Sequence, residues 1–251
     1  MLFFLVVFAL AVPFWVLGAE WDIQLLPGLP IAALMFVCPA LAAVILSWRE
    51  HGAAGVSAQL KRALDYDRIR SAVWLAPILL LKPALAAAAW GIMRLQGTPV
   101  PVPHFEMLPA LALIVVFFIA ALGEELGWSG YALDPLQGRW DALRASLVLG
   151  AAWAVFHYVA LVQVHRSAEW IAWWSLGTVA ARVVMVWLYN NTGKSVFAVS
   201  LFHMTSNVSW QLFPVSGSYM DPRLDGLLMA AVAVVVVVVW GPRTFTRQKV
   251  P

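Results

Sequence analysis

Residues 107–130 read MLPALALIVVFFIAALGEELGWSG. The stretch begins with an apolar run long enough to cross a bilayer, for which about 20 such residues are needed. It ends on two adjacent carboxylates, Glu124 and Glu125. An ionisable side chain is costly in hydrocarbon and is usually retained there for a function. The stretch therefore predicts a membrane helix that carries an acid–base group.

The composition of the whole chain places it in a membrane. Hydrophobic residues make up 63% of the 251 residues, charged residues 12%, and the mean hydropathy is +0.83. Soluble domains carry about 25% charged residues. Eight apolar stretches read as spans, namely 2–18, 30–47, 71–93, 106–126, 144–163, 168–190, 195–214 and 225–241. We expect an all-α, polytopic membrane helix bundle, with residues 1–251 as a single integral membrane domain and a catalytic core at about 106–215.

Several other classes of protein are not indicated. The first span lacks the basic n-region of a signal peptide, so we interpret it as a membrane helix. The single cysteine, Cys38, excludes an internal disulfide. No P-loop, dinucleotide fingerprint or zinc-finger spacing is present. The net charge of +3 comes from loops and indicates membrane orientation, with the lipid bilayer and not nucleic acid as partner.

The basic residues predict the orientation of the spans. With the N-terminus in the cytoplasm, eleven Lys and Arg fall inside: Arg49, Lys61, Arg62, Arg68, Arg70, Arg139, Arg144, Lys194, Arg243, Arg247 and Lys249. Three fall outside: Arg94, Arg166 and Arg223. Cytoplasmic loops are enriched in these residues, so we expect both termini in the cytoplasm. The short loops favour a bacterial inner membrane.

Two surface features follow from this orientation. Trp170, Trp173 and Trp174 fall at the outer end of the sixth span, where an aromatic belt is expected. In the 48–70 segment, Leu60, Leu64 and Ile69 stand among charged residues, so the segment could lie along the inner surface as an amphipathic helix.

Further polar clusters lie in the fifth and seventh spans, at His157 and at His203 with Asn207. His203 is about 12 Å from the cytoplasmic start of its span and His157 about 20 Å from the start of its own. Glu124 and Glu125 reach the cytoplasmic end of theirs. We therefore expect all these side chains to meet in a cytoplasm-facing cavity.

Each cluster also has a structural interpretation. Adjacent carboxylates often mark a solvated helix end, and Gly123-x-x-x-Gly127 is a helix-packing motif. A lone membrane histidine such as His157 commonly makes a hydrogen bond between helices. His203 and Asn207 are four residues apart and lie on one helix face, so that face is expected to contact polar groups or water.

The order and spacing of these clusters resemble the CPBP intramembrane proteases, or Abi family, which include the type II CAAX prenyl endopeptidases. That family has Glu-Glu-x-x-x-Arg, then Phe-x-x-x-His, then His-x-x-x-Asn or Asp, each on its own helix. This chain has GEELGWSG at 123–130, WAVFH at 153–157 and HMTSN at 203–207. The resemblance spans about 120–210.

The chain departs from the family pattern at two positions. Ser129 stands where the family usually has Arg, and Trp153 where it usually has Phe. The missing arginine removes a bidentate partner for a carboxylate. Arg182, in the middle of the sixth span, is a candidate replacement whose expected partner is Glu124 or Glu125; a snorkelling or carbonyl-capped arginine is the alternative. Lys82 is the other cation within a span.

The resemblance implies an intramembrane endopeptidase and a role for each residue. Glu124 and His157 would activate a water, His203 and Asn207 would stabilise the oxyanion, and Glu125 would orient the others or pair with a cation. A zinc ion held by Glu124, His157 and His203 is a rival version, although no His-Glu-x-x-His is present. We favour metal-independent chemistry. The substrate implied is a peptide or protein, prenylated or a leader peptide.

Two other functions remain open. Gly127-Trp128-Ser129-Gly130 matches the Gly-x-Ser-Gly of rhomboid proteases, in which Ser129 would be the nucleophile and His203 its base. However, rhomboids place their His-and-Asn oxyanion helix before the serine, and that order is reversed here. A non-catalytic transporter or scaffold could use the same acids and bases as a proton relay, but no internal repeat pairs the two halves of the chain.

Overall fold

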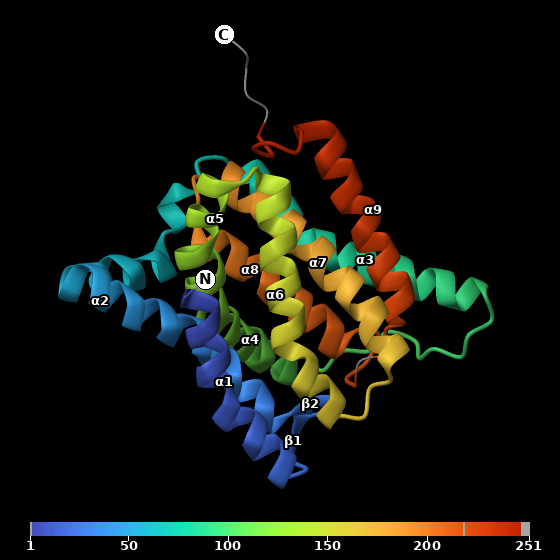
Figure 1. Cartoon of the computed structure of the whole chain (residues 1–251). Helices are drawn as coiled ribbons and strands as arrows, with labels where there is room; N and C mark the ends of the chain where they lie inside the picture. The colour runs from blue at the N-terminus through green and yellow to red at the C-terminus, as the bar shows by residue number, and fades with distance from the viewer. Residues whose placement is uncertain (1, 218, 247–251) are drawn as a thin grey trace.

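The structure, a computed structural model, describes residues 2–217 and 219–246 and consists almost entirely of helices (Figure 1). The α-helices are α1 (Leu2–Glu20), α2 (Cys38–Lys61), α3 (Leu75–Leu95), α4 (Met107–Gly127), α5 (Leu133–Arg139), α6 (Ala142–Gln163), α7 (Ala168–Asn191), α8 (Val196–Leu212) and α9 (Pro222–Trp240). A short antiparallel hairpin of β1 (Gln24–Leu26) and β2 (Leu29–Pro30) leads into a 3₁₀ helix, η1 (Ile31–Val37).

Seven helical stretches in the described ranges are long and apolar enough to cross a membrane. They correspond to seven of the eight expected spans. The eighth, expected at 195–214, is α8, whose 17 residues fall short of a full span. The expected all-α polytopic membrane bundle is thus confirmed, with one helix shorter than the sequence suggested.

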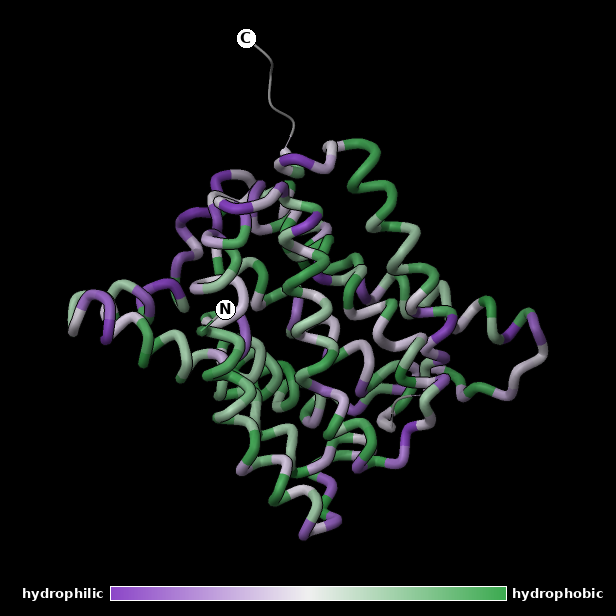
Figure 2. Tube along the Cα trace, viewed as in Figure 1, coloured by the Kyte–Doolittle hydropathy of each residue, from purple (hydrophilic) through white to green (hydrophobic). Residues whose placement is uncertain are grey.

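The outer surface of the bundle is apolar. Figure 2 shows long hydrophobic stretches along the helices, with hydrophilic residues gathered mainly near the helix ends and connecting turns. Leu5, Val115 and Val238 are 67%, 59% and 77% exposed. Large apolar side chains exposed in this number indicate a surface that lies against lipid, because a soluble monomer rarely shows so wide an apolar surface.

The centre of the bundle is formed by α7 and α8. α6 and α9 pack against α7, while α3 and α4 pack against α8, and α2 covers α4 (Figure 1). Four helices that carry the polar clusters, α4, α6, α7 and α8, therefore surround one region of the interior.

Gly123 and Gly127 allow α4 to approach the preceding segment closely. A Cβ at Gly127 would lie 2.3 Å from the carbonyl oxygen of Pro39, and one at Gly123 would lie 2.8 Å from the ring of Phe36. The helix-packing interpretation of Gly123-x-x-x-Gly127 is therefore confirmed. This contact fixes the end of α4, where the two carboxylates lie.

The segment at 48–70 differs from the expected surface helix. α2 is broken at Gly52, which has φ +61°, and ends at Lys61. Two 3₁₀ turns follow, η2 (Arg62–Leu64) and η3 (Tyr66–Arg68). Leu64 is exposed as expected, but Asp65 is only 7% exposed, because its carboxylate is turned toward Ser195 at the start of α8.

Candidate active site

Glu124 and Glu125 lie in the last turn of α4 and are followed by a π-helical turn, η5 (Trp128–Ala132). Glu124 is 6% exposed and Glu125 is fully buried. The interpretation of the pair as a solvated helix end is therefore wrong. Neighbouring helical residues point about 100° apart, and the two carboxylates accordingly have different partners.

Glu125 forms a buried ion pair with Arg182 of α7. Arg182 Nη1 donates to Glu125 Oε2 at 2.7 Å and Nη2 to Oε1 at 3.0 Å, and both residues are 0% exposed. The expectation that Arg182 pairs with one of the two carboxylates is confirmed. Arg182 thus brings a guanidinium to Glu125 from α7, whereas the motif of this chain has Ser129 in place of its usual arginine.

Ser129 and His203 complete the cluster around Glu125. The Ser129 hydroxyl donates to Glu125 Oε2 and accepts from Arg182 Nη1 at 3.3 Å. His203 of α8 faces Glu125 through Nδ1, which lies 3.1 Å from Oε1. A carboxylate paired with a guanidinium only accepts hydrogen bonds, so His203 donates from Nδ1. Four polar groups from α4, η5, α7 and α8 thereby meet in one buried cluster.

Glu124 is held by two tryptophans. Trp153 Nε1 donates to Glu124 Oε2 at 2.6 Å and Trp128 Nε1 donates to the same oxygen at 3.3 Å. The Trp153 ring also lies under the guanidinium of Arg182, 4.2 Å from its centroid. Trp153, a mild departure from the family pattern by sequence, therefore touches both a carboxylate and the cation of the site. The only sequence signal was that a buried indole N–H needs an acceptor.

The other oxygen of Glu124, Oε1, faces both histidines. His157 Nε2 lies 4.0 Å from it and His203 Nε2 lies 3.9 Å from it. His157 Nδ1 lies 2.8 Å from the carbonyl oxygen of Trp153 and must donate, because a carbonyl only accepts. In the neutral imidazole, Nε2 then carries the lone pair, and this nitrogen is the one that lies near Glu124.

A cavity of about 300 Å³ opens beside these groups. Glu124, His157, His203 and Asn207 line it, and Asn207 is half-buried. The structure thus brings together all four residues that the sequence proposed as catalytic. Ser129, by contrast, is 1% exposed and is not one of the lining residues.

Two further charged side chains line the cavity. Lys82 of α3 donates to Asp225 of α9 at 2.8 Å and 3.1 Å. Lys82 is therefore engaged away from the two glutamates, and Arg182 is the cation of the site. Trp170 and Trp174, which we expected in an aromatic belt, line the cavity as well.

The spacing of the three proposed zinc ligands is wider than zinc requires. Zn–N and Zn–O bonds of about 2.0–2.2 Å place tetrahedral ligand atoms about 3.3–3.6 Å apart, whereas Glu124 Oε1 is 3.9–4.0 Å from each Nε2. In the described residues, no group of three or more His, Cys, Asp or Glu is arranged to hold a metal ion.

The cavity extends from Glu124 toward the β1–β2 hairpin. Its exposed lining residues are Leu25 of the hairpin, Leu34 of η1 and Val116 of α4. The charge distribution predicts that the hairpin end lies outside the cytoplasm. With the N-terminus in the cytoplasm, the exposed part of the cavity lining would face the outer side and the bilayer, whereas the sequence led us to expect a cytoplasm-facing cavity.

Comparisons with known proteins agree with the motif positions. Residues 106–209 match the family model described as type II CAAX prenyl endopeptidase Rce1-like. The chain is also similar to CAAX prenyl protease 2 of Methanococcus maripaludis, with 26% identity over 140 residues. That alignment covers 52% of this chain and 50% of the relative, so the chain spans about half the length of this curated protein. The family match contains all three motif-bearing segments.

Proposed function

We propose that the chain is a CPBP-family intramembrane protease, an integral membrane endopeptidase with Glu124 and His157 as the water-activating pair. The observation that carries the proposal is the placement of two hydrogen-bond acceptors, Glu124 Oε1 and His157 Nε2, 4.0 Å apart at the wall of the cavity.

Two acceptors at this separation suit a single water molecule. Hydrogen bonds of about 2.8 Å from one water to both atoms close a triangle with an apex of about 90°. Such a water directs both hydrogens toward the protein and its lone pairs toward the cavity. We propose that Glu124 takes the proton as the water attacks a peptide carbonyl, while His157 helps to hold the water.

Glu124 would afterwards return that proton to the leaving amine. The attack forms a C–O bond and a tetrahedral oxyanion; collapse of the oxyanion breaks the C–N bond, and the amine leaves protonated. The two indole N–H groups at Oε2 keep Oε1 as the oxygen that faces the reaction. Proton removal and delivery then occur at one atom.

His203 and Asn207 are proposed to stabilise the oxyanion from one face of α8. His203 Nδ1 already donates to Glu125, so Nε2 can donate only when the ring is an imidazolium. Each of its ring nitrogens lies within 4 Å of a glutamate oxygen, Nδ1 near Glu125 Oε1 and Nε2 near Glu124 Oε1. Asn207 would add a neutral N–H donor, and such preorganised donors account for much of the catalysis of acyl transfer.

The cavity accommodates a peptide with apolar side chains or an apolar attachment. Its lining is mostly aliphatic and aromatic, including Phe117, Phe156, Trp174 and Trp210. We propose a peptide or protein substrate, prenylated or a leader peptide.

The serine-protease alternative is less well supported by the geometry. The Ser129 hydroxyl bonds Glu125 and Arg182, and among the described residues no hydrogen bond joins it to either histidine of the site. A serine nucleophile needs a base within hydrogen-bond reach and access to the substrate.

Cleavage of a fluorogenic library of CAAX-type and double-glycine peptides by the purified protein tests the proposal. Glu124→Gln and His157→Ala should each abolish cleavage and still purify as monodisperse species, while Glu20→Gln and His104→Ala, at exposed positions, should cleave normally. Loss of cleavage in Ser129→Ala with retention in Glu124→Gln would establish the serine mechanism. Loss on chelation and recovery with zinc would establish the metal version. No cleavage by the wild type would favour a transporter or scaffold.

A further inference from the structure

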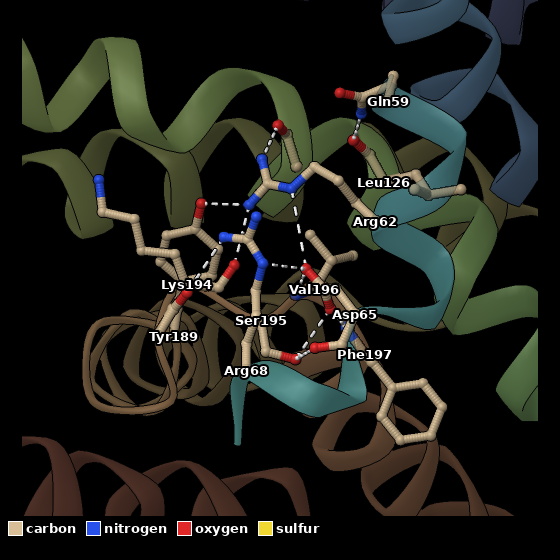
Figure 3. A network of polar contacts seen from close by, with 12 residues as sticks. Gln59, Arg62, Asp65, Arg68, Leu126, Tyr189, Lys194, Ser195, Val196 and Phe197 are labelled. Atoms are coloured by element: carbon tan, nitrogen blue, oxygen red, sulfur yellow. Dashed lines mark hydrogen bonds and ion pairs between the residues drawn. The ribbon is translucent and has the colours of Figure 1, made fainter. Parts of the chain in front are cut away.

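The helices that carry Glu125, Arg182 and His203 are joined a second time, at the surface, by residues 59–68 (Figure 3). This segment comprises the end of α2 and the turns η2 and η3. Its polar side chains Gln59, Arg62, Asp65 and Arg68 point toward the bundle. They make hydrogen bonds or ion pairs to η5, to α7 and to the start of α8.

Arg62 connects the first two of these elements. Its Nη1 donates to the carbonyl oxygen of Gly130 in η5, and its Nη2 donates to the Tyr189 hydroxyl of α7 at 2.7 Å. Nη2 also donates to the carbonyl oxygen of Lys194, in the turn that leads into α8, at 2.9 Å. Gly130 is five residues after Glu125, and Tyr189 is seven residues after Arg182. One guanidinium thus ties together the ends of the segments that bear the buried ion pair.

Asp65 fixes the start of α8. Its carboxylate accepts from the Ser195 hydroxyl at 2.9 Å, from Phe197 N at 3.0 Å and from Val196 N at 3.2 Å. A carboxylate at a helix N-terminus satisfies the free N–H groups and interacts favourably with the helix dipole. His203 lies two turns further along the same helix. The rotation and depth of α8 set by Asp65 therefore determine where the imidazole lies.

The contacts are too close to allow these elements to slide. A Cβ at Gly130 would lie 2.9 Å from Gln59 Nε2, and a Cβ at Gly193, which has φ +64°, would lie 2.9 Å from the carbonyl oxygen of Arg68. Gln59 Nε2 also donates to the carbonyl oxygen of Leu126 at 2.5 Å, one residue after Glu125. The segment holds α4 and α8 in fixed register at the end of the bundle nearest the site.

We propose that Arg62 and Asp65 are positioning residues for the site: they set the separation between Glu124 and His203 by holding η5, α7 and the start of α8. This inference rests on the proposed hydrolase function. A misplacement of about 1 Å in a catalytic group can cost roughly a hundredfold in rate. The contribution of Arg62 should therefore appear in kcat, because neither residue lines the cavity.

The test compares Arg62→Gln, Arg62→Lys and Asp65→Asn with Arg70→Gln, which removes an exposed arginine two residues beyond the segment. Arg62→Gln and Asp65→Asn should lower kcat by about tenfold or more, with KM changed less than about twofold, when rates are normalised to the monodisperse fraction. Arg62→Lys keeps the charge but loses the fork, and should recover folding and part of kcat. Arg70→Gln should match the wild type in both parameters.

A double-mutant cycle separates positioning from stability. If Arg62 acts through the Glu125 cluster, Arg62→Gln should cost much less in kcat in a Glu125→Gln background than in the wild type. Additive effects on kcat, or a lower thermal midpoint with unchanged kcat, would mean that the segment only stabilises the fold, and would overturn the inference. Absence of cleavage by the wild type would instead contradict the proposed function.

Discussion

Replacing Arg182 by methionine should be among the most damaging single changes in this protein. Both members of the Arg182–Glu125 pair are 0% exposed, and the guanidinium makes two hydrogen bonds to the carboxylate and one to Ser129. Removal of one partner of a buried pair typically costs about 3–5 kcal/mol, because the other charge is left uncompensated. The total stability of a domain is about 5–15 kcal/mol, so the loss is a large share of it.

The loss of stability in Arg182→Met has two sources, the uncompensated charge of Glu125 and the lost packing of the arginine side chain. Adding Glu125→Gln to Arg182→Met removes the orphaned carboxylate and should recover part of the stability. The recovery would be measured as the thermal midpoint of the monodisperse fraction in detergent. Activity should not recover with it, because Glu125 also holds His203. Recovery of stability without activity would show that the pair does more than fold the bundle.

The sharpest form of this prediction is a reversal of sign. Ser129→Arg in the wild type forces a second guanidinium into a filled, like-charged site, so it should lower both stability and cleavage. In the Arg182→Met background the same substitution supplies the missing cation from the motif position and should restore part of both. If Ser129→Arg is equally harmful in the two backgrounds, Arg182 does not replace the motif arginine, and the compensation argument is wrong.

Three further outcomes are expected. Trp153→Phe removes a hydrogen bond to a charged Glu124, worth about 1.5–3 kcal/mol, so kcat in the peptide assay should fall roughly ten- to a hundredfold; an unchanged rate would mean that the indole does not orient the carboxylate. Gly127→Ala should lower the thermal midpoint, costing about 1–3 kcal/mol by overpacking against α2, whereas Gly91→Ala, with open space around it in α3, should be neutral or stabilising. Reporter fusions in the β1–β2 hairpin should read out outside the cytoplasm and a fusion at residue 138 inside it; the opposite pattern would invert the bundle.

The pairing of Arg182 could be predicted because the sequence showed both a cation without a partner and carboxylates without their usual cation. A guanidinium within a span needs a partner, and the motif carboxylates lacked their usual cation. The choice between Glu124 and Glu125 could not be predicted. It depends on the rotation of the last turn of α4, which the contact of Gly127 with Pro39 and the π-helical turn after it determine. Neither is encoded in hydropathy or in motif spacing.

The role of the 48–70 segment was missed for a different physical reason. Its mixture of leucines and charged residues is typical of a helix on a membrane surface, and Leu60 and Leu64 are indeed exposed. Asp65, however, is buried against the N-terminus of α8, 130 residues away in the chain. A capping interaction between distant segments leaves no local pattern, since the cap residue and the helix that it caps are adjacent only after folding.

The position of the cavity links the membrane orientation to the class of substrate. Arg62, Arg68 and Lys194 gather at the end of the bundle opposite the β1–β2 hairpin, and the positive-inside rule places that end in the cytoplasm. The cavity instead reaches the surface at the hairpin and at the flank between η1 and α4. With the expected orientation, a peptide enters from the outer side or from the bilayer, and its scissile bond lies deep, near Glu124. A cytoplasmic peptide can follow that path only in the inverted orientation. The readout of the hairpin fusion therefore also selects between an exported or membrane-embedded substrate and a cytoplasmic one.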